Sequence, residues 1–260
     1  MSSETALVIA QIPFWTWAFT LILARVAAAV MLLPGIAEAA APSIVRVGIA
    51  LALTLVLLPV LAPLLPAQPA SWALFAKALL VETFDGLFLG WLARVLALAL
   101  PMAGQMISYM IGVSSVLQND ITIGTGATAV GSLFSVTIPV VLLGTGLYAL
   151  PLQALVGSYR LLPPGQLIPQ QLGAEQAVLT VAIGFALALK LSSPFIMGSI
   201  IWYTSVALTA RLVPRIQIYF LAAPAQILGG IVLFALVATS LITLWQNTIG
   251  SEFAMLPGLR

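Results

Sequence analysis

The stretch VLALALPMAGQMISYMIGVSSVLQN, residues 95–119, contains no charged side chain. It is longer than the roughly 20 apolar residues that an α-helix needs to cross a bilayer. Three further uncharged stretches of at least this length cover residues 47–76, 121–159 and 216–251. In the whole chain of 260 residues, 62% of residues are hydrophobic and only 6% are charged. The sequence therefore predicts an integral membrane protein.

Turn-forming residues divide the apolar blocks into about six long helices. We expect these helices at residues 14–33, 44–65, 74–100, 128–157, 176–207 and 217–246. Four prolines fall inside the blocks, and each removes a hydrogen bond from a helix. We therefore expect kinks or breaks at Pro139, Pro151, Pro194 and Pro224. The predicted fold class is all-α, a polytopic membrane-type protein of partly kinked helices.

Two acidic residues lie in the apolar segment VETFDGLFLGWLAR, residues 81–94. Glu82 and Asp85 are three residues apart, so a helix would carry both on one face. Ionisable side chains inside a membrane segment are costly, and they usually have a partner or a function. This pair is therefore the first candidate site in the chain.

Three explanations remain open for the two carboxylates. In the first, they pair with Lys77, with Arg94 or with an arginine of another helix. In the second, they titrate in a proton-coupled transporter of small molecules or ions. The third is a metal-dependent membrane phosphotransferase, but no further acid follows Asp85 before Asp120. The chain has no histidine and no cysteine, which excludes the common metal-ligand sets and histidine-dependent catalysis.

Two rows of side chains follow the segment PMAGQMISYMIGVSSVL, residues 101–117, at helical spacing. One row consists of Met102, Met106 and Met110. The other consists of Gly104, Ser108 and Gly112, and it faces nearly the opposite way. Small residues at every fourth position allow a neighbouring helix to approach closely. Flexible thioethers either fill a core or form a deformable lining.

Several motifs, in chain order, resemble the FliR (SctT) family of the bacterial flagellar and type III secretion export gate. The acidic helix resembles the family pattern acid-x3-G-x3-G through Glu82, Gly86 and Gly90. The next segment resembles the family through Ala103, Gly104, Gly112, Ser114 and Asp120. A later element resembles it through Arg211, Pro214, Ile216, Ile218 and Pro224. Near the N-terminus the matching positions are Arg25, Pro34, Pro42, Arg46 and Pro59.

The resemblance implies a single FliR-type export-gate domain over residues 1–260, built of helical hairpins in the bacterial inner membrane at the flagellar basal body. It implies a noncatalytic subunit, without cofactor or metal, that forms part of a closed pore for unfolded secreted proteins. Expected partners are FliP, FliQ, FlhB and FlhA homologues and membrane lipid, and no nucleic acid.

The resemblance also implies roles for individual residues. A plug loop in the pore would consist of Gly112, Val113, Ser114, Ser115, Val116, Leu117, Gln118, Asn119 and Asp120. Met102, Met106 and Met110 are candidates for lining or sealing the pore, and Gly104, Ser108 and Gly112 for helix packing. Buried charge or assembly contacts are expected at Arg25, Glu82, Asp85, Arg94, Arg211 and Arg215.

Overall fold

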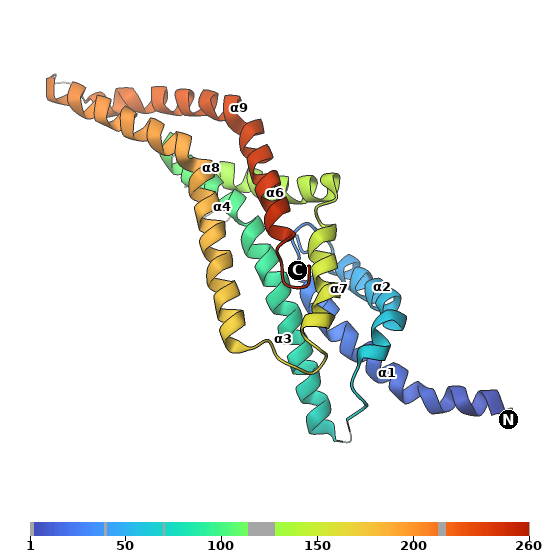
Figure 1. Cartoon of the computed structure of the whole chain (residues 1–260). Coiled ribbons are helices and arrows are strands. Elements are labelled where there is room, and N and C mark those ends of the chain that lie inside the picture. Colours follow the sequence, from blue (N-terminus) through green and yellow to red (C-terminus); the bar gives the residue numbers. More distant parts are fainter. Residues whose placement is uncertain (1–2, 39–40, 70, 114–127, 213–216, 260) are drawn as a thin grey trace. The chain divides into compact units, whose positions relative to one another are not determined.

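The computed structural model describes residues 3–38, 41–69, 71–113, 128–212 and 217–259, and within these ranges it contains helices and loops but no β-strand (Figure 1). The α-helices are α1 (Ser3–Val30), α2 (Ser43–Leu61), α3 (Trp72–Ala97), α4 (Ala99–Ile111), α6 (Ala129–Thr145), α7 (Ala149–Leu161), α8 (Gln170–Leu212) and α9 (Ile218–Phe253). A 3-10 turn (Ala62–Leu64) follows α2. In the described residues, five helical stretches are long and apolar enough to cross a membrane, or six if the bent pair α6 and α7 is one span. The prediction of an all-α polytopic membrane protein is confirmed.

The third predicted helix, residues 74–100, continues further than expected. α3 ends at Ala97 and α4 begins at Ala99, and together they form one apolar stretch of 40 residues. Pro101 explains the interruption at Leu98, because proline has no N–H to donate to the carbonyl of Ala97. The helical pattern resumes when Met102 donates to the carbonyl of Leu98, with an N···O distance of 3.1 Å.

The fourth predicted helix, residues 128–157, is two helices in the structure. α6 and α7 are bent by 74° relative to each other. The break expected near Pro151 lies instead at Gly146, whose φ of +77° is a conformation that glycine adopts without steric cost. Pro151 follows in the first turn of α7, where a missing N–H costs little.

The remaining prolines lie inside continuous helices, Pro139 in α6, Pro194 in α8 and Pro224 in α9. Both α8 and α9 change direction along their length (Figure 1). These two helices also extend beyond the predicted bounds, from Gln170 to Leu212 and as far as Phe253. Similarly, α1 begins at Ser3 rather than at residue 14. The predicted ends followed the fall in hydropathy, whereas polar residues such as Gln and Glu continue a helix readily.

The chain forms two compact units, and each combines separate stretches of sequence. Unit 1 consists of residues up to 95, residues 141–180 and residues from 250 onward, and unit 2 consists of residues 96–140 and 181–249. The helices α3, α6, α8 and α9 therefore contribute residues to both units. The segments of the two units alternate along the chain, so neither unit is one continuous stretch of sequence. The single domain over residues 1–260 stays a prediction.

The core of unit 1 is built on α1. Trp17 is buried there, donates through Nε1 to the carbonyl of Pro66 at 3.2 Å, and has its ring 5.0 Å from that of Phe75. α3 reaches α1 through two glycines. A Cβ atom added to Gly86 would overlap the carbonyl of Arg25, and one added to Gly90 would lie 2.7 Å from the carbonyl oxygen of Ala29. Glycine at both positions therefore allows the two backbones to approach closely.

The core of unit 2 is packed from α4, α6, α8 and α9. A Cβ atom added to Gly104 of α4 would lie 2.9 Å from the Cα of Gly131 in α6, so these helices also meet through glycines. The ring of Phe234 in α9 lies 5.8 Å from that of Phe134 in α6 and 6.3 Å from that of Phe195 in α8. Aromatic contacts thus join three helices of this unit.

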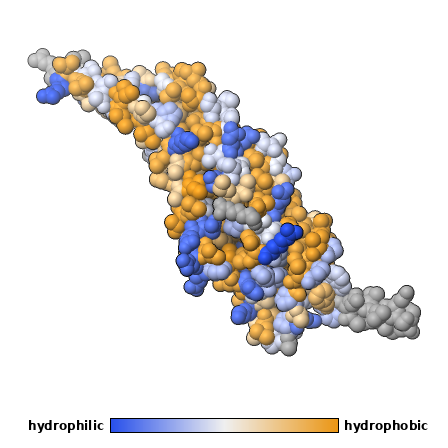
Figure 2. Space-filling model, in the orientation of Figure 1, coloured by the Kyte–Doolittle hydropathy of each residue, from blue (hydrophilic) through white to orange (hydrophobic). Residues whose placement is uncertain are grey.

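Large apolar side chains cover much of the visible surface (Figure 2). On α8 and α9 within unit 2, for example, Ile201 is 67% exposed, Leu221 is 72% exposed and Leu236 is 75% exposed. Extended apolar surfaces of this kind mark contact with a membrane or with other proteins. They agree with helices that lie in lipid and in a larger helical assembly.

Candidate functional site

Arg25 of α1 is the centre of a buried polar cluster in unit 1. Its guanidinium donates to the Glu82 carboxylate through Nε at 2.7 Å and through Nη2 at 3.1 Å. Nη2 also lies 3.4 Å from Oδ2 of Asp85. All three side chains are 0% exposed. The structure therefore places both acids of α3 against an arginine of another helix.

The other side of the Arg25 guanidinium contacts α7 and the loop that follows it. Nη1 donates to Oγ of Ser158 at 3.3 Å and to the carbonyl of Leu162 at 3.2 Å. The guanidinium carbon lies 4.2 Å from the centre of the Tyr159 ring, within cation–π range. Every nitrogen of the guanidinium thus has a hydrogen-bond partner, which is what a buried arginine requires.

The two carboxylates also bind the backbone of the α7–α8 loop. The N–H of Gly165 donates to Oε1 of Glu82 at 2.8 Å, and the N–H of Ile168 donates to Oδ1 of Asp85 at 3.4 Å. One guanidinium and two carboxylates carry a formal net charge of −1, so these N–H groups supply further positive dipole ends. The cluster of Arg25, Glu82 and Asp85 therefore joins α1, α3, α7 and one loop.

Other predicted charge positions lie outside this cluster. Arg94 pairs with Glu38, with Nη1 2.8 Å from Oε1, and Arg46 donates to the backbone carbonyl of Glu38 at 2.9 Å. Arg211 is exposed in the last turn of α8. Arg215 lies outside the described residues. Of the arginines considered for a buried site, the cluster contains Arg25 alone among those that the structure describes.

The small-residue row of α4 lies against α6 in unit 2. Gly104 faces Gly131, as described above, and Oγ of the fully buried Ser108 accepts the N–H of Val130 at 3.4 Å. That bond satisfies one of the first N–H groups of α6, which have no partner within the helix. The row therefore both allows the close approach and holds the start of the neighbouring helix.

The methionine row of α4 lies on the opposite face. The sulfur of Met106 accepts a hydrogen bond from the hydroxyl of Ser192 at 3.4 Å, and that of Met110 accepts one from Ser199 at 3.1 Å. Both serines belong to α8. Met102, Met106 and Met110 are each partly exposed. Two of the three thioethers thus pack on another helix of unit 2 while keeping part of their surface free.

α4 ends at Ile111, and the first residue of the predicted plug loop, Gly112, caps it. Gly112 has a φ of +80°, and the N–H of Val113 donates to the carbonyl of Ser108 at 3.2 Å, a common way for a helix to terminate. The side chain of Gln226 in α9 donates to the carbonyl of Met110 at 2.9 Å. Residues Ser114 to Asp120 of the predicted loop lie outside the described residues.

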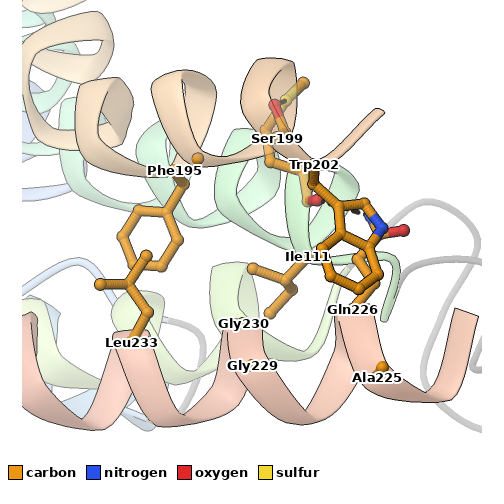
Figure 3. A pocket seen from close by; sticks show the side chains of 11 residues that line it. Ile111, Phe195, Ser199, Trp202, Ala225, Gln226, Gly229, Gly230 and Leu233 are labelled. Atoms are coloured by element: carbon orange, nitrogen blue, oxygen red, sulfur yellow. Dashed lines mark hydrogen bonds between the residues drawn. The ribbon is translucent and has the colours of Figure 1, made fainter. Parts of the chain in front are cut away.

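A cavity of about 150 Å³ lies beside this helix end in unit 2 (Figure 3). Phe195, Ser199 and Trp202 line it from α8, and Ala225, Gln226, Gly229, Gly230 and Leu233 line it from α9, with Ile111 between the two helices. The lining is mostly apolar and contains no charged side chain. It could accept a small apolar group, but it offers no acid or base for catalysis.

Comparison with known proteins identifies the family. The model of the family described as bacterial export proteins, family 1, matches residues 16–251. The flagellar biosynthetic protein FliR of Caulobacter vibrioides is 30% identical over 234 residues, which cover 90% of this chain and 93% of that protein. The chain belongs to the FliR family of bacterial export proteins. It is accordingly a component of the flagellar protein-export apparatus and a multi-pass protein of the inner membrane.

The pattern acid-x3-G-x3-G, through which this chain resembles the family, has a physical explanation in the structure. Glu82, Gly86 and Gly90 are one helical turn apart, so they lie on one face of α3. Gly86 and Gly90 place that face directly on α1, and Glu82 then reaches Arg25 from the same face. The pattern therefore combines a close helix contact with the buried cluster that the contact encloses.

Sequence reasoning missed several residues that these sites use. Ser158 and Gly165 were not singled out because they are uncharged and lie far from Glu82 in the sequence. Gln226 and Gly230 were also missed, although Gln226 carries the only polar side chain between Phe220 and Ala238. A lone amide in such an apolar helix signals a hydrogen-bond partner, because an unpaired amide in lipid is costly.

Proposed function

We propose that this FliR-family chain is a noncatalytic subunit of the export gate, in which it forms part of a closed inner-membrane pore for unfolded secreted proteins. Within that pore, residues 112–120 act as the plug. The observation that carries this proposal is the end of α4. There an apolar helix terminates at Gly112, under contact from α9, and the chain continues into a polar segment with the sequence SSVLQND.

The polar segment suits a position in a pore. Polar side chains are tolerated at membrane depth only where protein or water satisfies them. The segment supplies side chains that water or a neighbouring subunit can bind, at Ser114, Ser115, Gln118 and Asn119. The partly exposed Met102, Met106 and Met110 are proposed to complete the seal, since thioether side chains adapt to irregular surfaces.

The physical task of such a plug is to prevent ion leakage. Moving one elementary charge across the membrane is worth about 2.3 kcal/mol per 100 mV, so a permanently open pore would dissipate this energy. A gate must therefore remain closed until a secreted chain displaces the seal. That task needs no nucleophile, metal or cofactor.

The assembly partners belong to the same proposal. We expect the chain to assemble with FliP, FliQ, FlhB and FlhA homologues, which would cover part of the exposed apolar surface of α8 and α9 while lipid covers the rest. Native mass spectrometry of the chain, coexpressed with these homologues and extracted in detergent, should give a hetero-oligomer. A monodisperse monomer under those conditions would contradict the proposal.

The central experiment removes the plug. Deletion of Gly112 to Asp120 should leave the complex assembled but permeable to ions, because the rest of unit 2 keeps its helix contacts. Ion flux would be measured in vesicles that contain the purified complex. A Gly-Ser segment of equal length in place of residues 112–120 is the matched control for the length of the connection, and it should leak as well. A deletion complex that remains impermeable to ions would contradict the assignment of residues 112–120 as the plug.

The alternative is a proton-coupled transporter that uses Glu82 and Asp85. Both carboxylates are fully buried and bonded to Arg25 and to backbone N–H groups, which supports a structural role. Glu82→Gln distinguishes the two functions. A transporter predicts an assembled but inactive complex, whereas the gate predicts less assembled complex, measured by copurification of the partners.

A further inference from the structure

Unit 1 contains a cavity of about 290 Å³ beside the charge cluster. Its walls come from α3, from the end of α7, from the start of α8 and from the segment that follows α9. Ser158, Leu162 and Ile168 belong both to these walls and to the contacts of the cluster. An occupant of the cavity would therefore touch residues that hold the buried charges.

The segment after α9 forms one wall of the cavity and lies against α7 (Figure 1). Met255 and Pro257 line the cavity from this segment. Gly258 follows them with a φ of +106°, and a Cβ atom added to it would overlap the carbonyl of Ala154 in α7. Close backbone contact thus fixes this wall, so the cavity has a defined boundary on that side.

The lining of the cavity suits an apolar occupant. Apart from Ser158 and Gln176, the lining residues are apolar or glycine, and none of those that the structure describes is charged. Oγ of Ser158 already donates to the carbonyl of Leu155 at 2.6 Å and accepts a hydrogen bond from Arg25. The Gln176 side chain is partly exposed and makes no hydrogen bond to a residue within the described ranges. The cavity therefore combines an apolar space with one available amide.

The size of the cavity favours a chain over a single side chain. A cavity of about 150 Å³ takes one benzene molecule, so one of twice that volume accommodates about a dozen carbon atoms. The ring of an inserted phenylalanine would fill only half of it. Leu161, Leu172 and Met255 line the cavity and are each more than half exposed, so it opens to the surroundings of the protein. For a protein of the inner membrane, those surroundings include lipid acyl chains.

We propose that this cavity binds one acyl chain of a membrane phospholipid, and that the Gln176 amide donates a hydrogen bond to the ester carbonyl of that chain. The ester lies at the polar end of the acyl chain and accepts hydrogen bonds, and Gln176 is a partly exposed donor in the wall. The bound chain is a structural ligand, which stabilises the α7–α8 loop against the charge cluster. This role does not depend on residues 112–120.

The first test measures the phospholipid that the full-length chain retains in detergent, by native mass spectrometry. Delipidated protein is titrated with dipalmitoyl phosphatidylethanolamine and with the dihexadecyl ether lipid, which has the same headgroup but no ester carbonyl. The wild type should retain one lipid and bind the ester form about fivefold more tightly, which corresponds to one ordinary hydrogen bond. Gln176→Met should lose this preference and keep the affinity of the wild type for the ether form.

The second test enlarges one side chain of the wall. Leu172→Trp should lower the affinity for both lipids about tenfold, the effect of displacing two methylene groups from an apolar site. Leu179→Trp is the matched control, because Leu179 is a similarly exposed leucine about two turns further along α8 that does not line the cavity. The ester lipid should also raise the midpoint of thermal unfolding of the wild type and of Leu179→Trp, but not of Leu172→Trp, since a ligand of the folded state stabilises it.

Three results would overturn the proposal. A wild type that retains no lipid, or equal retention by Leu172→Trp and Leu179→Trp, would show that the cavity is not a lipid site. If Leu172→Trp does not fold, the comparison of Gln176→Met with the wild type decides, and equal binding of the ester and ether lipids by the wild type would contradict the role of Gln176. A photoreactive residue at position 172 that crosslinks to a coexpressed partner protein rather than to lipid would assign the cavity to a protein contact.

Discussion

The two units of this protein stabilise their helix contacts by opposite means. In unit 1, α1 and α3 enclose a guanidinium and two carboxylates that are fully buried. In unit 2, α4 meets α6 and α9 through glycines, serine and one amide, without an ion pair among the described residues. Both units use glycine to bring backbones together. They differ in whether the helix contact encloses charged side chains.

This difference determines how each unit should respond to substitution. A buried charge cluster depends most on the member that balances the others, because removal of that member leaves opposite charges buried without compensation. Neutral contacts are individually weak and more nearly independent, so their loss should cost less.

Arg25→Met should have the largest effect. It leaves Glu82 and Asp85 buried without a cation, and breaking a buried pair from one side costs about 3–5 kcal/mol. We expect little folded protein in the membrane, measured as the monodisperse fraction after detergent extraction. Arg25→Lys restores the charge but not the two-pronged bond to Glu82, so its yield should be intermediate. Wild-type yield from Arg25→Met would refute the importance of the cluster.

Gly86→Ala should have the second-largest effect on stability. The added methyl group would overlap the backbone carbonyl of Arg25, which no rotamer change can avoid. We expect a loss near the upper end of the range for overpacking, about 3 kcal/mol, in thermal unfolding of the detergent-solubilised protein. Gly48→Ala in α2 is the matched control, since its Cβ atom would meet nothing within 4 Å. Equal stability of the two variants would show that α1 and α3 can separate without cost.

Gly104→Ala should cost less than Gly86→Ala. Its methyl group would lie 2.9 Å from Gly131 and from the ring of Phe134, a clash that a small shift of neutral helices can relieve. The expected loss is about 1–2 kcal/mol in the same unfolding assay. The control within unit 2 is Gly229→Ala, which has open space around its Cβ atom. A loss as large as that of Gly86→Ala would remove the contrast between the units.

Asp85→Asn should have the smallest effect. Its contact to Arg25 is the longer one, at 3.4 Å, and the cluster carries one negative charge more than the guanidinium neutralises. An asparagine keeps an oxygen for the N–H of Ile168 and brings the formal charge to zero, so we expect a change within about 1 kcal/mol. A destabilisation as severe as that of Arg25→Met would mean that the second carboxylate is required in its charged form.

The fold was largely predictable because composition and uncharged length already require membrane helices. The details that escaped prediction are those in which two local signals compete. The break was expected at Pro151, but the chain turns five residues earlier, at Gly146, since glycine rather than proline can adopt a positive φ. The bounds predicted from hydropathy were also too short for the long helices, because their ends are polar.

For each candidate site, the sequence indicated the residues on one helix but not their partners on another helix. The spacing of Glu82 and Asp85 indicates a shared helix face, but nothing local identifies Arg25, which is 57 residues from Glu82 in the sequence. The same applies to Met110 and Gln226, which are 116 residues apart. Patterns along one helix describe its faces, whereas the partner of a face depends on how helices pack.

The α7–α8 loop has a consequence for how this protein can evolve. Leu162, Gly165 and Ile168 each present one backbone group to the charge cluster, at intervals of three residues. Because backbone groups make these bonds, side chains in the loop can be exchanged except at Gly165, whose φ of +85° favours glycine. Adding or removing one residue would shift the register of all later contacts. The length of the connection is therefore more tightly constrained than its sequence, in which Gly165 is the exception.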